Sequence, residues 1–207
     1  MYRYAEGAGT AALFEWIWDI DFLSSTELIC TDYINHCLRH VDLSLSPPET
    51  STFAGNCTVP GDADGHRLNT ALFDFPRYTE VNNNNSSLFV LDYSKILHII
   101  DLTADIVTPF VKFAVYFYDM KILGDNLLYF TQNHQTMLFN ISTQEENLIA
   151  GAPTYGSAIG SFEHTRFHDP RDLLQWKDEV NTLLLVADYY NDRFAGFYLQ
   201  SKNTISI

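Results

Sequence analysis

The sequence predicts an all-β chain, a β-propeller with about four blades, each blade a four-stranded antiparallel sheet. A unit of strand, polar turn and strand runs over residues 28–43, and its pattern returns over 88–102, more faintly over 127–141, and over 183–199. Aromatic residues form 14% of the 207 residues, which suits strands better than helices. No segment carries an apolar stripe with a 3.6-residue period, so stacked helical repeats are disfavoured.

The repeats divide the chain into segments of about one blade each. We expect a single domain over residues 1–207, with repeats at about 10–54, 70–111, 113–150 and 162–207. Connectors rich in glycine, which permits the positive φ of tight bends, precede every repeat except the third. An aromatic-led strand follows each connector, and the Phe-x-x-Pro-Arg of residues 73–77 recurs at 167–171. The third repeat enters through residues 113–120 instead and is the most degraded copy.

The two ends of the chain both resemble outer strands of a blade. Residues 1–5 match the outer strand that elsewhere precedes a connector, while residues 204–207 already resemble the outer strand of the last repeat. We therefore expect residues 1–5 to form an extra outer strand. Three alternatives follow: the strand clasps the last blade, it belongs to a larger propeller of which this chain is a piece, or it adds to the edge of a neighbouring molecule.

Charge and hydropathy exclude two classes of partner. The formal net charge is −14 and the isoelectric point about 4.6, so a nucleic-acid phosphate backbone would be repelled. No apolar run approaches the roughly 20 residues that span a bilayer, and the first residues have no signal-peptide core. We expect a soluble chain that binds no nucleic acid, and one that is mature or truncated if it is secreted.

The cysteines bear on the compartment. Cys37 begins one predicted strand and Cys57 ends the next, so a hairpin about Pro47 would place them opposite each other, at a separation that a disulfide can bridge. Such a bond would contribute roughly 3 kcal/mol in the chain-entropy model. The alternative is two reduced cysteines in a cytosolic protein. Cys30 lies in an apolar run and is interpreted as a buried free thiol.

Glycosylation sequons give a second indication of the compartment. They place candidate glycan acceptors at Asn56, Asn84, Asn85 and Asn140. Asn56, Asn84 and Asn85 fall in predicted loops, where a glycan would not disturb a core. Together with the cysteine pair, these sequons favour an extracellular protein.

The chain resembles the NHL-repeat family of β-propellers, particularly its extracellular members. The residues that carry this resemblance are Asp32, Asn35-His36-Cys37, Arg39, Ala54-Gly55-Asn56-Cys57 and Asp64-Gly65. The match is weaker in repeat three, where Thr131 replaces the expected Asp, and in repeat two, where Ser94-Lys95 replaces Asn-His. The resemblance implies a propeller of four-stranded blades, with the disulfide linking the two outer strands of one blade. It implies no single activity, because one fold hosts many functions.

The repeated polar residues are interpreted as structural. Aspartates at the strand ends can accept backbone N–H bonds, and asparagines tolerate the left-handed conformation of tight turns. The aspartates are Asp32, Asp92 and Asp188, and the asparagines are Asn35, Asn133 and Asn191. His36 and His134 share a repeat position and are expected to pack in the turns rather than to bind a metal.

Three aspartates form the main candidate for a metal site. Asp19, Asp119 and Asp172 occupy one repeat position, if a gap of one residue is allowed at Asp119. If they face a shared axial channel, their carboxylates could bind a hard cation such as calcium. The alternative is that each carboxylate bonds local backbone or lies at a solvated rim. His164, His168 and Asp169 resemble part of a metal cluster, although the rest of such a set is not identifiable.

Two functional hypotheses remain. The first is a secreted, non-enzymatic propeller that recognises an extracellular protein or glycan, or assembles with itself through strand addition at its termini. The second is a metal-dependent lyase or hydrolase with a site on the propeller axis. No nucleophile motif, phosphate loop or dinucleotide fingerprint is present, and no catalytic residue is predicted.

Overall fold

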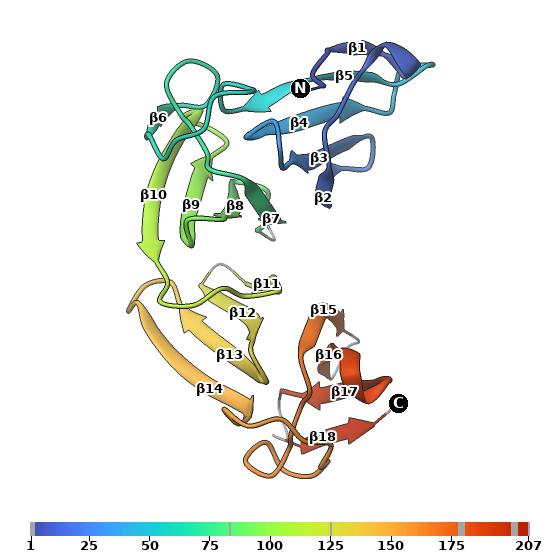
Figure 1. Ribbon diagram of the computed structural model, residues 1–207, viewed down its shortest axis with the longest axis vertical. Helices are drawn as coiled ribbons and strands as arrows, with labels where there is room; N and C mark the ends of the chain where they lie inside the picture. The colour runs from blue at the N-terminus through green and yellow to red at the C-terminus, as the bar shows by residue number, and fades with distance from the viewer. Residues whose placement is uncertain (1–2, 83, 125, 178–180, 200–202, 207) are drawn as a thin grey trace. The chain divides into compact units, whose positions relative to one another are not determined.

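The computed structural model describes residues 3–82, 84–124, 126–177, 181–199 and 203–206, and these are nearly all β. The strands form four antiparallel sheets, each one blade (Figure 1), which confirms the predicted fold class of a β-propeller with four-stranded blades. The chain consists of two compact units: unit 1 is Met1–Ala114 and unit 2 is Val115–Ile207. Each unit contains two blades. No helix in the described ranges is long and apolar enough to span a bilayer.

Unit 1 contains blades 1 and 2. Blade 1 consists of β2 (Ile17–Ser24), β3 (Glu27–Asp32), β4 (Cys37–Asp42) and β5 (Glu49–Ala54), with the short strand β1 (Gly7–Ala8) paired to β5. Blade 2 consists of β7 (Pro76–Val81), β8 (Ser87–Asp92), β9 (Ile96–Asp101) and β10 (Ile106–Lys112), with β6 (Gly65–His66) paired to β10. The helical turn η1 (Gly9–Ala11) follows β1.

Unit 2 contains blades 3 and 4. Blade 3 consists of β11 (Asp119–Leu123), β12 (Leu127–Gln132), β13 (Gln135–Asn140) and β14 (Glu145–Gly151). Blade 4 consists of β15 (Pro170–Lys177), β16 (Thr182–Asp188), β17 (Arg193–Tyr198) and β18 (Asn203–Ser206). The helical turn η2 (Tyr189–Asn191) joins β16 to β17.

Burial follows the position of a strand within its blade. In β8, five of the six residues are buried because both faces of this central strand are covered. The outer strand β14 begins with four exposed residues. Apolar side chains from blades 1 and 2 form one core, which includes Ile29, Phe53 and Leu88, and those from blades 3 and 4 form another around Phe167, Leu184 and Phe197. The blades within each unit are therefore held together face to face.

A β-bulge distinguishes three of the inner strands from the fourth. The pairing of β2, β7 and β15 with the next strand shifts by one residue near their starts, whereas β11 pairs with β12 without a shift. The extra bulge residue is missing from β11, which explains why Asp119 aligns with the other repeats only when a gap is allowed.

The extra outer strand lies later in the chain than we expected. Residues 1–2 are outside the described ranges, and of the remaining predicted residues only Ala5 pairs, in an isolated bridge to Leu13. Instead β1, at Gly7–Ala8, pairs with Thr50 and Glu49 of β5. The added strand therefore extends blade 1.

Candidate functional site

The predicted disulfide between Cys37 and Cys57 is present, with an S–S distance of 2.08 Å and a Cα–Cα distance of 5.0 Å. Cys37 begins β4, but Cys57 lies in the loop after β5, so the bond joins a strand to a loop rather than two outer strands. Cys30 is a buried free thiol, and burial raises its pKa to about 12. It therefore remains a protonated, inert thiol.

The repeated aspartates hold the turns. In blade 1, Asp32 Oδ2 accepts hydrogen bonds from Asn35 Nδ2 at 2.9 Å and Arg39 Nη1 at 3.0 Å. In blade 4, Asp188 Oδ2 accepts them from Asn191 Nδ2 and Arg193 Nε, both at 2.8 Å. Asp92 has a comparable role, accepting from the Ile96 N–H at 3.0 Å. These bonds match the structural role that the sequence predicts.

The two turn histidines fix the entry of the following blade. His36 Nδ1 accepts a hydrogen bond from the Phe75 N–H, and His134 Nδ1 accepts one from the Asp169 N–H, each at 3.1 Å. Phe75 and Asp169 have positive φ angles of 52° and 63°, a conformation that side-chain-bearing residues adopt at a cost. The bonds satisfy the backbone where it is strained, in keeping with the expected packing role.

The three aspartates of the proposed metal site each bond protein groups. In unit 1, Asp19 Oδ2 accepts a hydrogen bond from the Thr79 N–H of blade 2 at 2.8 Å. In unit 2, Asp119 Oδ2 accepts one from the Leu173 N–H of blade 4 at 2.8 Å, and Asp119 also bonds Asp172. Burial, followed by this bond to Asp172, holds the pKa of Asp119 well above its usual range.

The bonds to the Thr79 and Leu173 N–H groups each join one blade to the next. The sequence had suggested bonds to local backbone instead. Among the residues that the structure describes, no three His, Cys, Asp or Glu side chains are grouped as metal ligands. The calcium site stays a prediction.

The histidine and aspartate set in the last connector is distributed among separate partners. His164 Nδ1 lies 2.7 Å from Ser161 Oγ, and Asp169 Oδ2 accepts a bond from Arg171 Nη2 at 2.6 Å. His168 stacks on the ring of Tyr155, with ring centroids 4.5 Å apart. Each of these side chains therefore has its own structural contact.

The sequon asparagines differ in exposure. Asn56, Asn84 and Asn85 are exposed, whereas Asn140 is half-buried at the end of β13. The Asn140 Oδ1 accepts bonds from two backbone N–H groups of the following turn. A glycan fits the first three positions with less rearrangement than the fourth.

An exposed aromatic surface in unit 1 is the most distinctive feature that the sequence reasoning missed. We define the unit-1 aromatic surface as Trp16, Trp18, Tyr33, Phe75, Arg77 and Tyr93. Trp16 and Phe75 precede the inner strands of their blades, Trp18 and Arg77 lie within those strands, and Tyr33 and Tyr93 lie in the turns after β3 and β8. Two separate segments of each blade, the start of the inner strand and the turn, therefore contribute to one surface.

The rings of this surface form a continuous chain of contacts. Centroids are 5.6 Å apart between Trp16 and Tyr33, 4.9 Å between Tyr33 and Phe75, and 6.0 Å between Phe75 and Tyr93. The Arg77 guanidinium carbon lies 4.6 Å from the Trp18 ring centroid and 4.8 Å from that of Tyr93. Cation–π attraction orders the arginine between the two rings. Trp16 is 63% exposed, so a ligand can stack on it.

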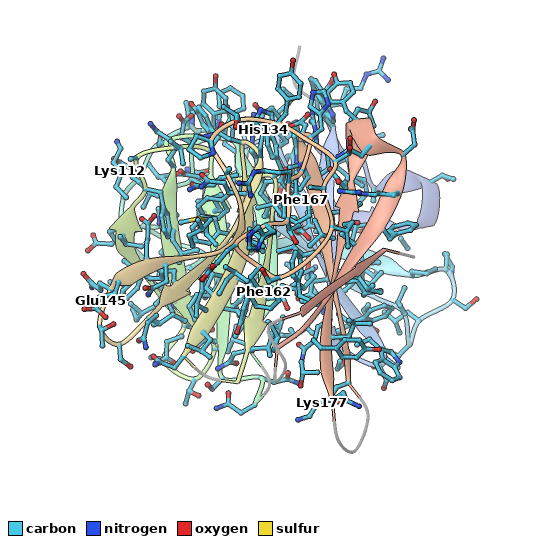
Figure 2. All side chains as sticks on the ribbon, turned by 90° about the horizontal axis from the view of Figure 1, so that it is seen from below. Lys112, His134, Glu145, Phe162, Phe167 and Lys177 are labelled. Carbon is cyan, nitrogen blue, oxygen red and sulfur yellow. A yellow bond between two sulfur atoms is a disulfide. The ribbon has the colours of Figure 1, made fainter. Side chains whose placement is uncertain are left out.

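Unit 2 carries a related group of aromatic side chains. Tyr155, Tyr189 and Tyr190 are exposed, and His168 packs between Tyr155 and Tyr190. Its arginine differs in bonding, because Arg171 forms an ion pair with Asp169 as well as packing on the Tyr189 ring. In Figure 2, His134 lies at one end of the unit-2 strands, and Glu145 and Lys177 lie towards the other end.

A signal in the sequence marks part of these surfaces. A tyrosine follows the strand-ending aspartate in three repeats, as Asp32-Tyr33, Asp92-Tyr93 and Asp188-Tyr189. Aromatic residues are also common in strands, so this spacing alone does not indicate a binding surface.

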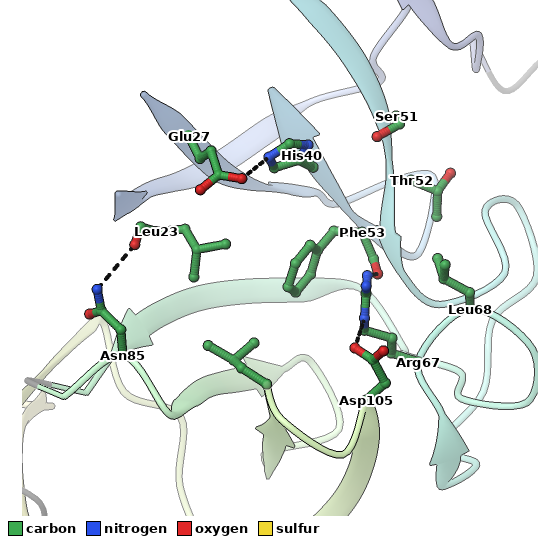
Figure 3. Close-up of a pocket in the computed structure, with 11 residues that line it drawn as sticks. Leu23, Glu27, His40, Ser51, Thr52, Phe53, Arg67, Leu68, Asn85 and Asp105 are labelled. Atoms are coloured by element: carbon green, nitrogen blue, oxygen red, sulfur yellow. Dashed lines mark hydrogen bonds and ion pairs between the residues drawn. The ribbon is translucent and has the colours of Figure 1, made fainter. Parts of the chain in front are cut away.

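A groove of about 580 Å³ lies between blades 1 and 2 (Figure 3). Its apolar lining includes Leu23, Phe53 and Leu102. Its charged side chains are paired with one another: Glu27 with His40 at 3.3 Å, and Arg67 with Asp105 at 2.5 Å.

Asn85 also lines this groove, and its Nδ2 donates to the Leu23 carbonyl at 3.3 Å. A glycan on Asn85 would therefore begin at the edge of the groove. Because the charged groups of the groove already have partners, it offers fewer directed contacts to a ligand than the aromatic surface does.

Comparison with known proteins places the chain among β-propellers. No protein-family model matches it, and no curated protein matches its sequence. An auxiliary nutrient binding protein from Bacteroides thetaiotaomicron matches with a TM-score of 0.56 and 14% identity, over 97% of this chain and 59% of that one. The WD40 repeats of RRP9 match with a TM-score of 0.56 and 9% identity, over 92% of this chain and 50% of that one.

A third match is the extracellular domain of a protein from B. thetaiotaomicron described as a hybrid two component system. Its TM-score is 0.56 and its identity 10%, over 98% of this chain and 23% of that one. This chain thus spans about three fifths of the auxiliary nutrient binding protein, and less of the other two. At these identities the likeness is one of fold, and the chain is similar to β-propeller proteins.

Proposed function

We propose that this chain is a secreted, non-enzymatic propeller of NHL-type repeats that binds neutral glycans through the unit-1 aromatic surface. The observation that carries the proposal is the exposed Trp16, which contacts Trp18, together with Arg77, which is ordered between the rings of Trp18 and Tyr93. The apolar C–H face of a sugar ring packs against the face of an aromatic ring, and a guanidinium donates hydrogen bonds to hydroxyl groups. Stacking of this kind takes place on an open surface and does not require a concave pocket.

The charge of the chain narrows the class of glycan. A net charge of −14 disfavours sulfated or otherwise polyanionic chains, as it disfavours nucleic acid. Neutral polysaccharides avoid this repulsion. The similar proteins include one named for nutrient binding and one extracellular domain, which agrees with a binding module outside the cell.

Affinity electrophoresis in gels that contain β-glucan, mannan or xylan tests this function. We expect at least one polymer to retard the chain, and Trp16→Ala to weaken binding by about 30-fold, as loss of a hot-spot ring of about 2 kcal/mol would. Leu148→Ala is the control, because Leu148 is an exposed apolar residue on β14 outside the surface. Unretarded migration of the wild-type chain in all three polymers, or equal weakening by both substitutions, would contradict the proposal.

The extracellular location has its own support and test. The Cys37–Cys57 disulfide and the exposed Asn56, Asn84 and Asn85 fit an oxidising, glycosylating route. Treatment of the protein from its native source with an N-glycosidase should lower its mass. Unchanged mass, together with reduced Cys37 and Cys57, would place the chain in a reducing compartment instead.

A cation at Asp119 and Asp172 is a second candidate, favoured by the contact of these two carboxyl groups across β11 and β15. A cation such as calcium would balance the charge of the two neighbouring carboxylates. Thermal melting with millimolar calcium tests this, and Asp119→Asn is the matched control. A rise in Tm in the wild type alone supports the site, and equal melting of both proteins removes it.

A further inference from the structure

Blade 1 exposes a face that is buried in blade 2. Ile20 pairs with Cys30 two residues before the end of β3, as Thr79 pairs with Val90 in blade 2. Ile20 and Thr79 therefore occupy the same position in their blades. Thr79 is only 2% exposed, because it lies against blade 1, but Ile20 is 56% exposed. Phe22, which corresponds to Val81, is 60% exposed, whereas Val81 packs on the core between the blades.

Blade 4 exposes the opposite face. Phe194 pairs with the residue before the end of β16, as Leu38 pairs with the residue before the end of β3. Leu38 is fully buried against blade 2, but Phe194 is 56% exposed. Trp176 corresponds to Leu23, which packs on the same core, and Trp176 is 48% exposed. We call Ile20 and Phe22 the front patch, and Trp176 and Phe194 the back patch.

A hydrogen bond between blades 1 and 2 also has unmatched counterparts on the exposed faces of blades 4 and 1. Asp19, two residues into β2 after Ile17, caps the Thr79 N–H of the next blade. Asp172 has the same position in β15, as the strand pairing shows, but it is an exposed residue. The residue of blade 1 that corresponds to Thr79 is Ile20. Asp172, whose carboxylate also contacts Asp119 and the Leu173 N–H, and the Ile20 N–H are therefore the counterparts of the two groups that bond between blades 1 and 2.

From these matched positions we infer that blade 4 of one copy of this chain packs on blade 1 of a second copy. The back patch meets the front patch, and Asp172 caps the Ile20 N–H across the joint. The contact is heterologous, since the two surfaces differ, so it repeats into a ring or a filament. This face-to-face joint is distinct from strand addition at the termini.

A second copy fits better than an unrelated partner because both halves of the joint reproduce contacts found inside unit 1. The partner must offer an apolar blade face in the correct sense, and also a backbone N–H at the position of Thr79. Blade 1 of another copy has both. The four side chains of the two patches are uncharged, and Asp172 enters the joint as the acceptor for the Ile20 N–H.

Light scattering during size-exclusion chromatography, over a wide concentration range, gives the first test. We expect the wild-type chain to exceed its monomer mass of 23.7 kDa, with dimers or larger species growing as concentration rises. Phe22→Asp and Trp176→Asp should each yield monomers. Leu148→Asp, which places the same charge on exposed β14, should associate like the wild type.

Mixing the two variants gives the decisive test. Phe22→Asp keeps its back patch and Trp176→Asp keeps its front patch, so an equimolar mixture has one intact joint and should form a dimer of twice the monomer mass. Far-ultraviolet circular dichroism confirms that each variant is folded before mixing. A wild-type chain that is monomeric at every concentration, or a mixture of folded variants that stays monomeric, overturns the proposal.

Discussion

Blades 1 and 3 share a fold but use different chemistry at its centre. In blade 1, Asp32 is fully buried and bonds both Arg39 and Asn35. In blade 3 the strand pairing places Gln132, rather than Thr131 as the sequence suggested, at the position of Asp32, and the Gln132 side-chain oxygen is buried without a hydrogen-bond partner. The turn of blade 3 is also shorter, with only Asn133 and His134 between β12 and β13. The blade therefore forms without the charged network, whose effect is to fix a longer turn.

Substitutions at this position should give the largest difference in stability between the two blades. Asp32→Ala leaves the Arg39 guanidinium buried without its carboxylate, which we expect to lower the free energy of unfolding by about 3–5 kcal/mol. Gln132→Met in blade 3 removes a side-chain oxygen that has no hydrogen-bond partner, keeps a similar shape, and should change the free energy of unfolding by less than about 1 kcal/mol.

Urea denaturation followed by circular dichroism measures both variants. Similar losses for the two substitutions would show that the charged network contributes little beyond what any buried side chain contributes there.

The disulfide is the second difference, because it reinforces blade 1 alone among the described residues. Replacing both cysteines, by Cys37→Ser and Cys57→Ser together, should cost roughly 3 kcal/mol in the chain-entropy model. The wild type in reducing agent should show the same loss in urea denaturation. A double variant as stable as the oxidised wild type would mean that the bond constrains a loop already held by blade 1.

The strands and the disulfide were predictable from sequence because both depend on local spacing. Alternation and turn residues define strands such as β3 and β4, and the hairpin between Cys37 and Cys57 sets the distance of the two sulfurs. The position of the extra strand near the N-terminus was harder to predict, because a segment as short as residues 1–5 or Gly7–Ala8 holds too few residues for a pattern.

The candidate site was not predictable in the same way. The contact of Trp18, Arg77 and Tyr93 depends on how blade 1 packs on blade 2, and no local pattern encodes that distance. The partners of Asp19 and Asp119 depend on the bulge that β2 has and β11 lacks, which shifts the register by one residue. Repeat spacing placed the two aspartates at equivalent strand positions, but it did not predict the backbone groups that they bond.

The contacts between the two blades also differ from unit 1 to unit 2. Their contributions to stability should depend on pH in opposite directions. In unit 2, burial and the contact with Asp172 raise the pKa of Asp119, so folding favours its protonated form. This contribution to stability is complete below the unfolded pKa, and it is lost as pH rises through the folded value.

Asp119→Asn should therefore add about 1 kcal/mol at neutral pH, since the amide keeps the acceptor for the Leu173 N–H without a charge. It should also flatten the dependence of stability on pH above about 4. Urea denaturation at several pH values measures this, and a loss of stability at neutral pH would contradict it.

The smallest expected effect lies at the turn of blade 1, where stability is lost as pH falls rather than as pH rises. Burial lowers the pKa of His36, whose Nδ1 must stay unprotonated to accept the bond from the Phe75 N–H, while the Asp74 carboxylate 3.7 Å away opposes this shift. The contribution of His36 is present above its unfolded pKa of about 6.5, and it is lost as pH falls through the lowered folded value. Between about pH 7.5 and 5, we expect a loss below about 1 kcal/mol that His36→Gln abolishes. Asp74→Asn should deepen the loss by removing the charge that favours the imidazolium. The change in unfolding free energy between the two pH values is measured for the wild type and both variants. If His36→Gln shows the same loss as the wild type, other groups cause the loss.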